Sequence, residues 1–312
     1  MRKVFGVMWA VALVGCGQTA TTGGSSSSSG SQATSPGRIE ATADGYKIVI
    51  SEFEVQPGEV QRCVVVPGLP EDMVVSHSQV RQQAGGHHMV LYTRDSARPG
   101  ETFDCTAAEA MGNARFIAPG NFEGGAQGLA YRVPANKPFI VQSHYINATP
   151  DVIRVSDEYT MVRAPAAATP KFIDFFALTE VGFLLPRGQS TVVVDCNIPR
   201  DMQVIRHFGH MHELGTHYSL ERIRNGQAEM VDTYEWDIEY RDNAPLRDAT
   251  LAAPYMFLAG DQLRLTCTYD NTRDHDVEFP EEMCVTFIHY VVDSNWNGFL
   301  TCGEGSQPEV VQ

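Results

Sequence analysis

Three histidines fall within ten residues of this sequence, and their spacing could support metal chemistry. The segment GHMHELGTHY, residues 209–218, contains His210, His212 and His217. On a β-strand, residues i and i+2 point to the same face, so the imidazoles of His210 and His212 can converge on one point. Imidazole is the commonest metal ligand in proteins. An isolated pair of this kind more often marks the polar face of a strand, so the rest of the chain has to decide.

Other side chains that bind metals lie elsewhere. His87 and His88 are adjacent, His144 lies in VQSHYIN, and Met283 lies in EEMCVTFIHY. Adjacent histidines on a regular strand point to opposite faces, so His87 and His88 can share a metal only if the chain bulges, which the two preceding glycines permit. Each residue alone has an ordinary explanation: coincidence for His87–His88, a hydrogen-bonded strand histidine for His144, and core packing for Met283.

Taken together, these residues would form one all-nitrogen site and one site with two imidazoles and a thioether. A soft thioether selects copper, especially Cu(I), whereas imidazole serves both oxidation states. Two different ligand sets suggest two tasks, one passing electrons and one handling a small molecule.

Length and charge limit the classes of protein to consider. The chain has 312 residues, a formal net charge of -15 and 43% hydrophobic residues, which suits two domains with substantial cores. The acidic balance argues against a nucleic-acid partner, because no basic groove is indicated.

The first residues have the pattern of an export signal. A basic start and a short apolar run end in LVGC, and this resembles the bacterial lipoprotein box, in which Cys16 is lipidated. We therefore predict a lipoprotein signal peptide over 1–16 and a flexible Gly/Ser/Thr-rich tether over 17–38. Membrane attachment through the lipid at the bacterial cell envelope would follow. The outer membrane is favoured, because Gly17 is not the aspartate that retains many lipoproteins at the inner membrane. The alternative is an ordinary secretory signal with a chance cysteine.

The remaining cysteines indicate disulfides. Apart from Cys16 the chain has six, an even number that in an exported protein predicts three bridges, although sequence alone does not choose the pairing. The absence of C-x-x-C argues against a thiolate zinc site.

The body of the chain reads as an all-β protein. Runs rich in β-branched and aromatic residues, separated by Gly, Pro, Asn and Asp, predict strands, and one short helix is predicted near 105–113. Strands at this spacing favour two tandem antiparallel β-sandwich domains, over 39–165 and 166–312, with the boundary in the Pro-rich segment RAPAAATPK. The strand predictions cover 46–55, 61–69, 87–93, 138–146, 190–198, 261–269 and 284–292.

The order of the motifs resembles a known family. H-H-M, Q-x-H-Y, H-x-H-x-L-G and E-E-M-C follow one another as in the copper type II, ascorbate-dependent monooxygenases, the family of dopamine β-monooxygenase and peptidylglycine α-hydroxylating monooxygenase. The resemblance runs from about residue 45 to 302. It implies two jelly-roll-like β-sandwich domains, each holding one copper ion.

The resemblance also implies roles for individual residues. It makes His87, His88 and His144 the ligands of an electron-transfer copper, and His210, His212 and Met283 the catalytic ligands of an oxygen-binding copper. The implied reaction is hydroxylation of a C–H bond of a small-molecule substrate by O2, with electrons from ascorbate or another one-electron donor. The disulfides it implies are Cys63–Cys105, Cys196–Cys302 and Cys267–Cys284.

Departures from the family concern the substrate. Peptidylglycine enzymes hold the peptide carboxylate with Arg, Asn and Tyr, and the matching places here are Phe208, Val285 and Phe287. An apolar wall cannot pair a carboxylate, so a neutral or aromatic small molecule is favoured over a peptide. Glu213 follows the H-x-H pair. Its carboxylate either lies in solvent on a loop or attracts a cationic amine substrate.

Two further histidines and two alternative functions stay open at this point. His207 and His217 flank the H-x-H pair, where they are either surface residues or donors that orient the ligand imidazoles. The alternative functions are a non-catalytic copper-binding or copper-delivery lipoprotein on the same fold, and a structural β-sandwich with unrelated histidines. Copper stoichiometry and turnover separate these alternatives from the monooxygenase.

Overall fold

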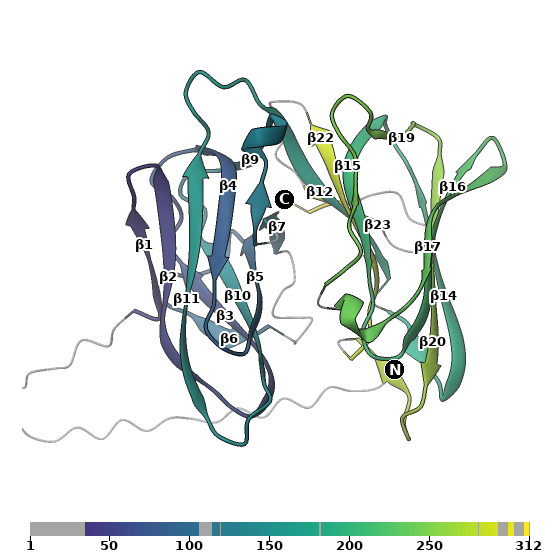
Figure 1. The fold of residues 1–312 in the computed structure, drawn as a ribbon, viewed down its shortest axis with the longest axis horizontal. Helices are drawn as coiled ribbons and strands as arrows, with labels where there is room; N and C mark the ends of the chain where they lie inside the picture. The colour runs from purple at the N-terminus through teal and green to yellow at the C-terminus, as the bar shows by residue number, and fades with distance from the viewer. Residues whose placement is uncertain are drawn as a thin grey trace, which may run out of the picture. The chain divides into compact units, whose positions relative to one another are not determined.

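The protein is built almost entirely of strands, as the all-β prediction requires (Figure 1). The computed structural model describes residues 35–105, 114–118, 120–180, 182–241, 243–279, 281–292, 299–302 and 309–311. Within these residues the helical elements are two short 3-10 turns, η2 (Gly125–Gln127) and η3 (Ile238–Arg241). The predicted signal segment 1–16, most of the tether 17–38, and the helix predicted near 105–113 apart from Cys105 lie outside the described residues.

All seven predicted strand segments are strands in the structure. Four of them alternate between buried and more exposed positions, which is the pattern of a sheet packed on one face, whereas the strands over 139–147 and 284–292 are buried at most positions. The seven strands are β2 (Gly45–Val55), β3 (Gly58–Val66), β5 (Gly86–Thr93), β10 (Phe139–Asn147), β14 (Gly188–Asn197), β20 (Gln262–Asn271) and β22 (Cys284–Val292).

Two facing sheets enclose the first apolar core. One has the order β1-β2-β11-β4-β9, with β8 pairing β4, and the other has the order β6-β3-β10-β5-β7. Alternate residues such as Ile48, Val64, Val141 and Tyr159 point between them and are fully buried. The additional strands are β1 (Gly37–Ala41), β4 (Met73–Arg81), β6 (Thr102–Asp104), β7 (Arg115–Ala118), β8 (Phe122–Glu123), β9 (Leu129–Val133) and β11 (Ile153–Arg163).

A second core lies between two further groups of strands. The order β14-β20-β16-β17 forms one face and β12-β22-β15-β18 the other, and side chains such as Leu220, Leu265 and Ile288 fill the space between them. These strands include β12 (Lys171–Glu180), β15 (Met202–His210), β16 (Gly215–Arg224), β17 (Gln227–Glu235) and β18 (Arg247–Asp248). Shorter pieces complete this half: β13 (Leu184–Leu185), β19 (Tyr255–Phe257), β21 (Val277–Glu278), β23 (Phe299–Cys302) and β24 (Glu309–Val311).

One sheet continues from the first group of strands into the second. β9 and β12 pair in parallel, with Leu129 opposite Lys171 and Ala130 opposite Phe172. Residues 35–312 form one compact unit. The Pro-rich segment 163–171 joins the end of β11 to the start of β12. The division into domains at residue 165 stays a prediction, because this sheet pairing runs across it.

The six cysteines of the body form three disulfides with the pairing that the resemblance implied. They are Cys63–Cys105, Cys196–Cys302 and Cys267–Cys284. Each bond restricts the unfolded chain, and a loop of the length closed by Cys267–Cys284 is worth roughly 3 kcal/mol of unfolding free energy. The Cys267–Cys284 bond fastens β20 to β22 at the residue that follows Met283 in the sequence.

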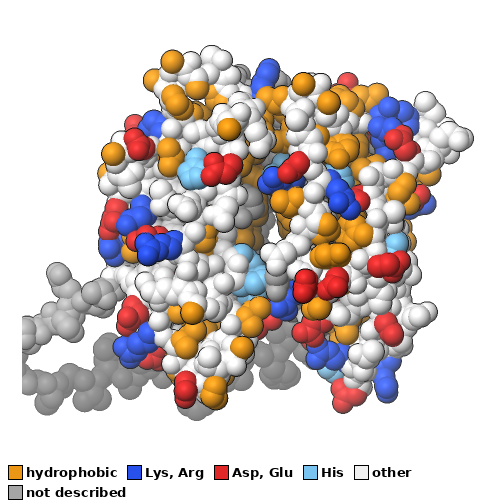
Figure 2. All heavy atoms as spheres, viewed as in Figure 1, with side chains coloured by type: hydrophobic (Ala, Val, Ile, Leu, Met, Phe, Trp, Pro, Cys, Tyr) orange, Lys and Arg blue, Asp and Glu red, His pale blue; other side chains and the backbone are white. Residues whose placement is uncertain are grey.

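The surface is mixed in charge. On the face shown in Figure 2, Lys and Arg side chains alternate with Asp and Glu rather than forming a stripe of one sign. The described residues contain no helix long and apolar enough to cross a membrane.

Candidate metal centres

Neighbouring strands bring His87, His88 and His144 together. His144 on β10 lies directly opposite His88 on β5, while the next residue, Tyr145, lies opposite Gly86. His87 is therefore an extra residue on β5, and the strand bulges there. Two adjacent histidines can share one metal only where the strand bulges, and the structure has such a bulge here.

The three imidazoles present the same nitrogen to one point. His87 Nδ1 lies 2.8 Å from His88 Nδ1 and 3.1 Å from His144 Nδ1. The possible ligand atoms of all three residues lie within 4.8 Å of one another. Neutral imidazole nitrogens can approach so closely only with a proton or a cation between them. This nitrogen set fits a copper or another borderline metal ion.

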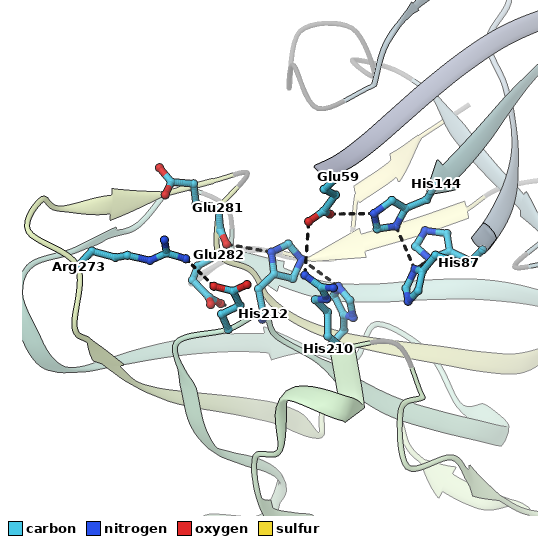
Figure 3. Close-up of polar contacts among 11 residues, drawn as sticks. Glu59, His87, His144, His210, His212, Arg273, Glu281 and Glu282 are labelled. Atoms are coloured by element: carbon cyan, nitrogen blue, oxygen red, sulfur yellow. Dashed lines mark hydrogen bonds and ion pairs between the residues drawn. The ribbon is translucent and has the colours of Figure 1, made fainter. Parts of the chain in front are cut away.

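A carboxylate fixes the orientation of His144. Its Nε2 lies 2.8 Å from Glu59 Oε1 on β3 (Figure 3). Because the carboxylate accepts a hydrogen bond from the Nε2–H group, the lone pair of Nδ1 is left for the metal. Arg241, on η3, lies 3.5 Å from the other oxygen of Glu59. Sequence analysis did not identify Glu59, since an isolated glutamate on a strand carries no motif.

The second group forms where β15 ends. His210 is the last residue of this strand and His212 lies two residues beyond it, yet their Nε2 atoms are 3.2 Å apart (Figure 3). His210 lies opposite Val285 on β22. If this register continued by two residues, Met283 would lie opposite His212, on the face that also carries His210. The pairing thus brings the segments that carry His210, His212 and Met283 to one end of β15 and β22.

The low pKa values of His210 and His212 favour metal binding, because they keep both rings unprotonated. Burial lowers the pKa of His210 well below its usual range, and the neighbouring His212 lowers it further. Burial also lowers the pKa of His212. Both rings are therefore neutral at pH 7, which is the form of imidazole that binds metals.

Backbone hydrogen bonds hold the two segments that carry His212 and Met283. The buried carboxylate of Glu282 accepts from the N–H groups of His212, Leu214 and Met283 at 2.9, 2.6 and 3.3 Å. Burial raises the pKa of Glu282 to about 7. The Nδ1 of His212 lies 3.0 Å from the carbonyl oxygen of Glu281, which leaves Nε2 for the metal. Sequence analysis interpreted the E-E-M-C motif only for its methionine and missed Glu282.

Aromatic rings form the surface beside His210. Phe208 and Phe287 lie opposite each other on β15 and β22, with ring centroids 5.3 Å apart, and Phe287 lies 6.3 Å from the ring of His210. Phe116 and Phe175 are buried, and Phe287 packs against the cluster that they form. His289 lies against Phe175, and burial lowers its pKa to about 3, so it adds a neutral imidazole. The surface is thus apolar and aromatic next to the metal ligands.

The sequence left open whether Glu213, His207 and His217 contribute to the site, and the structure gives each of them different surroundings. The ring nitrogens of His217 face Glu235 and Thr233. Glu213 is an exposed loop carboxylate whose Oε2 lies 2.5 Å from Arg273 on the surface, which favours the first of its two interpretations. His207 lies on the opposite face of β15 from His210, against Tyr255, so it does not orient a ligand imidazole.

His207 makes the stability of the protein depend on acid pH. It is fully buried, and neither ring nitrogen has a hydrogen-bond partner among the described residues. Burial lowers its pKa to about 4 from the ordinary 6.5. The unfolded chain therefore binds a proton that the folded chain rejects, and stability is lost as the pH falls from 6.5 towards 4.

Replacing His207 by leucine should remove this loss. We expect His207→Leu to gain roughly 2–3 kcal/mol of unfolding free energy over the wild type at pH 4.5, beyond any difference at pH 7. Urea unfolding at both pH values measures it. A difference between variant and wild type that is equal at the two pH values would contradict the assignment.

Comparison with known proteins shows a similarity in the C-terminal part of the chain. Residues 184–312 match the family described as "Copper type II ascorbate-dependent monooxygenase, C-terminal domain". This range contains His210, His212 and Met283. A peptidylglycine alpha-amidating monooxygenase from Rattus norvegicus is 25% identical over 204 residues, which cover 59% of this chain and 20% of that protein. The chain thus spans about a fifth of the length of the curated relative it matches.

Similarity to solved structures is low. PNGase F, a glycosylasparaginase from Flavobacterium meningosepticum, is 7% identical, with a TM-score of 0.34 over 85% of this chain and 99% of that chain. The major capsid protein from bacteriophage PM2 is 13% identical, with a TM-score of 0.32 over 83% and 97%. These scores carry no argument about fold or function. Residues 184–312 are thus similar to the C-terminal domain of the copper type II, ascorbate-dependent monooxygenases, and the rat protein is a distant relative of this chain.

Proposed function

We propose that this protein is an exported copper-dependent monooxygenase. It hydroxylates a C–H bond of a small organic substrate, using O2 and electrons from ascorbate or a similar one-electron donor. The observation that carries the proposal is the presence of two ligand groups of different chemistry. One offers three Nδ1 atoms from β5 and β10, and the other offers the Nε2 atoms of His210 and His212 at the end of β15, beside the segment before β22 that carries Met283.

The two groups suit different tasks. Bound copper would supply the one-electron chemistry that no side chain provides. The all-imidazole group accommodates both oxidation states, so it suits the passage of electrons. The His210, His212 and Met283 group contains a soft sulfur that favours Cu(I). The residues of the chain keep the imidazoles neutral and oriented, through Glu59 at one group and the Glu281 carbonyl at the other.

The aromatic surface beside His210 indicates the kind of substrate. Phe208 and Phe287 offer no group that could pair with a carboxylate, and burying an unpaired charge against them is costly. The rat relative is named for acting on peptidylglycine. For this chain we propose instead a neutral or aromatic small molecule, whose ring can pack edge-to-face against the two phenylalanines.

The proposed location is the bacterial cell envelope, with Cys16 as a lipid anchor. LVGC at residues 13–16 and the polar tether after it support this proposal. Three disulfides are also typical of proteins that fold in an oxidising compartment.

Copper content and oxygen consumption test the proposed function. The full chain should bind two copper ions and consume O2 with ascorbate and one of a panel of phenylethylamines, small aromatics and peptidylglycines. One atom of isotopically labelled O2 should appear in the product. Two copper ions without consumption across the panel would favour a copper carrier. One copper ion or none would contradict the ligand assignment.

A further inference from the structure

We propose that Glu282 is the positioning residue of the thioether-containing site. Its carboxylate fixes the backbone of His212 and Met283 relative to each other, so that an imidazole and a thioether from two separate segments reach the same metal ion. The identity of the metal depends on the proposed function, whereas the contacts that position the two ligands do not.

Both ligands lie where the strand ladder has stopped. β15 ends at His210 and β22 begins at Cys284, so neither His212 nor Met283 belongs to the β15–β22 pairing. The ladder therefore determines which residues face each other but does not hold them at a fixed distance. Sub-ångström placement of metal ligands requires a further support.

Glu282 supplies this support from one side. The residue is fully buried, with 0% exposure. Oε2 accepts from the N–H groups of His212 and Met283, and Oε1 accepts from the N–H of Leu214. One side chain thus joins the segment after β15 to the segment before β22. Both oxygens of a carboxyl group can accept hydrogen bonds, so one side chain can hold N–H groups of two segments at once.

Other side chains hold the same two residues from the opposite side. Trp236 Nε1 donates to the carbonyl oxygen of His212 at 2.9 Å, and the hydroxyl of Tyr269 donates to the carbonyl oxygen of Met283 at 2.7 Å. The peptide groups of both ligands are therefore fixed at their N–H and at their C=O. Among Glu282, Trp236 and Tyr269, Glu282 is the residue that contacts both ligands.

The preceding glutamate has a different role. The side chain of Glu281 is 52% exposed, and its Oε2 lies 3.5 Å from His275 on the surface. Only its backbone carbonyl reaches His212. Of the two acidic residues in E-E-M-C, the second therefore determines the placement of the ligands.

The test compares Glu282→Gln with Glu213→Gln. A glutamine keeps one acceptor oxygen but turns an NH2 group towards backbone N–H donors, so the three-bond arrangement cannot form. Glu213→Gln makes the same change in the loop after β15, and Glu213 binds only Arg273 among the described residues. The readouts are sulfur scattering at the copper K-edge of the Cu(I)-loaded chain, copper affinity, and hydrogen exchange of the amides of the metal-free chain.

We expect Glu282→Gln to lower copper affinity at the thioether-containing site by about 10–100-fold and to weaken sulfur scattering. The amides of His212, Leu214 and Met283 should exchange faster, while the three-histidine site and the Glu213→Gln control keep wild-type values. Wild-type sulfur scattering and exchange rates in Glu282→Gln would overturn the proposal.

A second variant covers the case in which Glu282→Gln fails to fold. Tyr269→Phe removes one hydroxyl that holds Met283. It should weaken sulfur scattering, by several-fold less than Glu282→Gln would, and leave the amide exchange of His212 unchanged. Unaltered sulfur scattering in Tyr269→Phe would then contradict the claim that these hydrogen bonds position Met283. If the wild type binds no copper, the proposed function fails, and amide exchange in the metal-free chain still decides the role of Glu282.

Discussion

Substituting isoleucine for Met283 should lower ascorbate-dependent O2 consumption by more than about 100-fold while one copper ion per chain remains. Loss of a residue that only supports a ligand costs about 10–100-fold in metal affinity or activity, so loss of a ligand should cost more. Isoleucine keeps an apolar side chain of similar size at this half-buried position but offers no sulfur. The fold should therefore survive, and the change should be confined to the soft ligand.

Copper analysis, sulfur scattering and an oxygen electrode measure the effect of Met283→Ile. Met230→Ile is the matched control, because Met230 is 49% exposed on β17 and lies away from the ligands in the sequence and the sheet order. Wild-type consumption in Met283→Ile, or unchanged sulfur scattering, would show that Met283 is not a ligand.

The second large effect is expected for His144→Ala. His144 is 3% exposed, and its Nδ1 is one of the three nitrogens that meet between β5 and β10. Alanine removes one of three imidazoles, and the two that remain come from adjacent residues of one strand. We expect the copper of this group to be lost and continuous O2 consumption to fall by more than about 100-fold. Sulfur scattering from the other copper should persist.

The control for His144→Ala is His77→Ala. His77 lies on β4 in the same half of the protein and contacts Glu123 on the surface. It should keep both copper ions and wild-type consumption. Full consumption in His144→Ala with a single copper ion would mean that the three histidines pass no electrons, and the proposed division of tasks between the two groups would be wrong.

Much of the fold could be predicted because its signals are local. The β-branched runs around Val64, Val141 and Val192 identify strands, since such residues suit a pleated, half-buried surface. The pair Gly85–Gly86 before His87 likewise indicated where β5 could bulge. The parallel pairing of β9 with β12 has no comparable signal, because it joins short segments about forty residues apart through tertiary packing alone.

The sequence identified the candidate ligands of the site but not the residues that hold those ligands in place. Two histidines at i and i+2, or a methionine beside a cysteine, form patterns that a resemblance can match. The partners that hold them, such as Glu59, Trp236 and Tyr269, lie on other strands and become neighbours only through folding. The surroundings of His207 could not be predicted either, because its lack of partners depends on which side chains surround it.

The disulfide between Cys267 and Cys284 has a consequence for the order of maturation. Cys284 directly follows Met283, and the bond fastens it to β20. In a chain with reduced cysteines this covalent attachment is missing from the segment that carries the thioether. We expect thiol oxidation to precede the acquisition of a correctly coordinated metal, so newly made chains would become competent for metallation only after reaching an oxidising compartment.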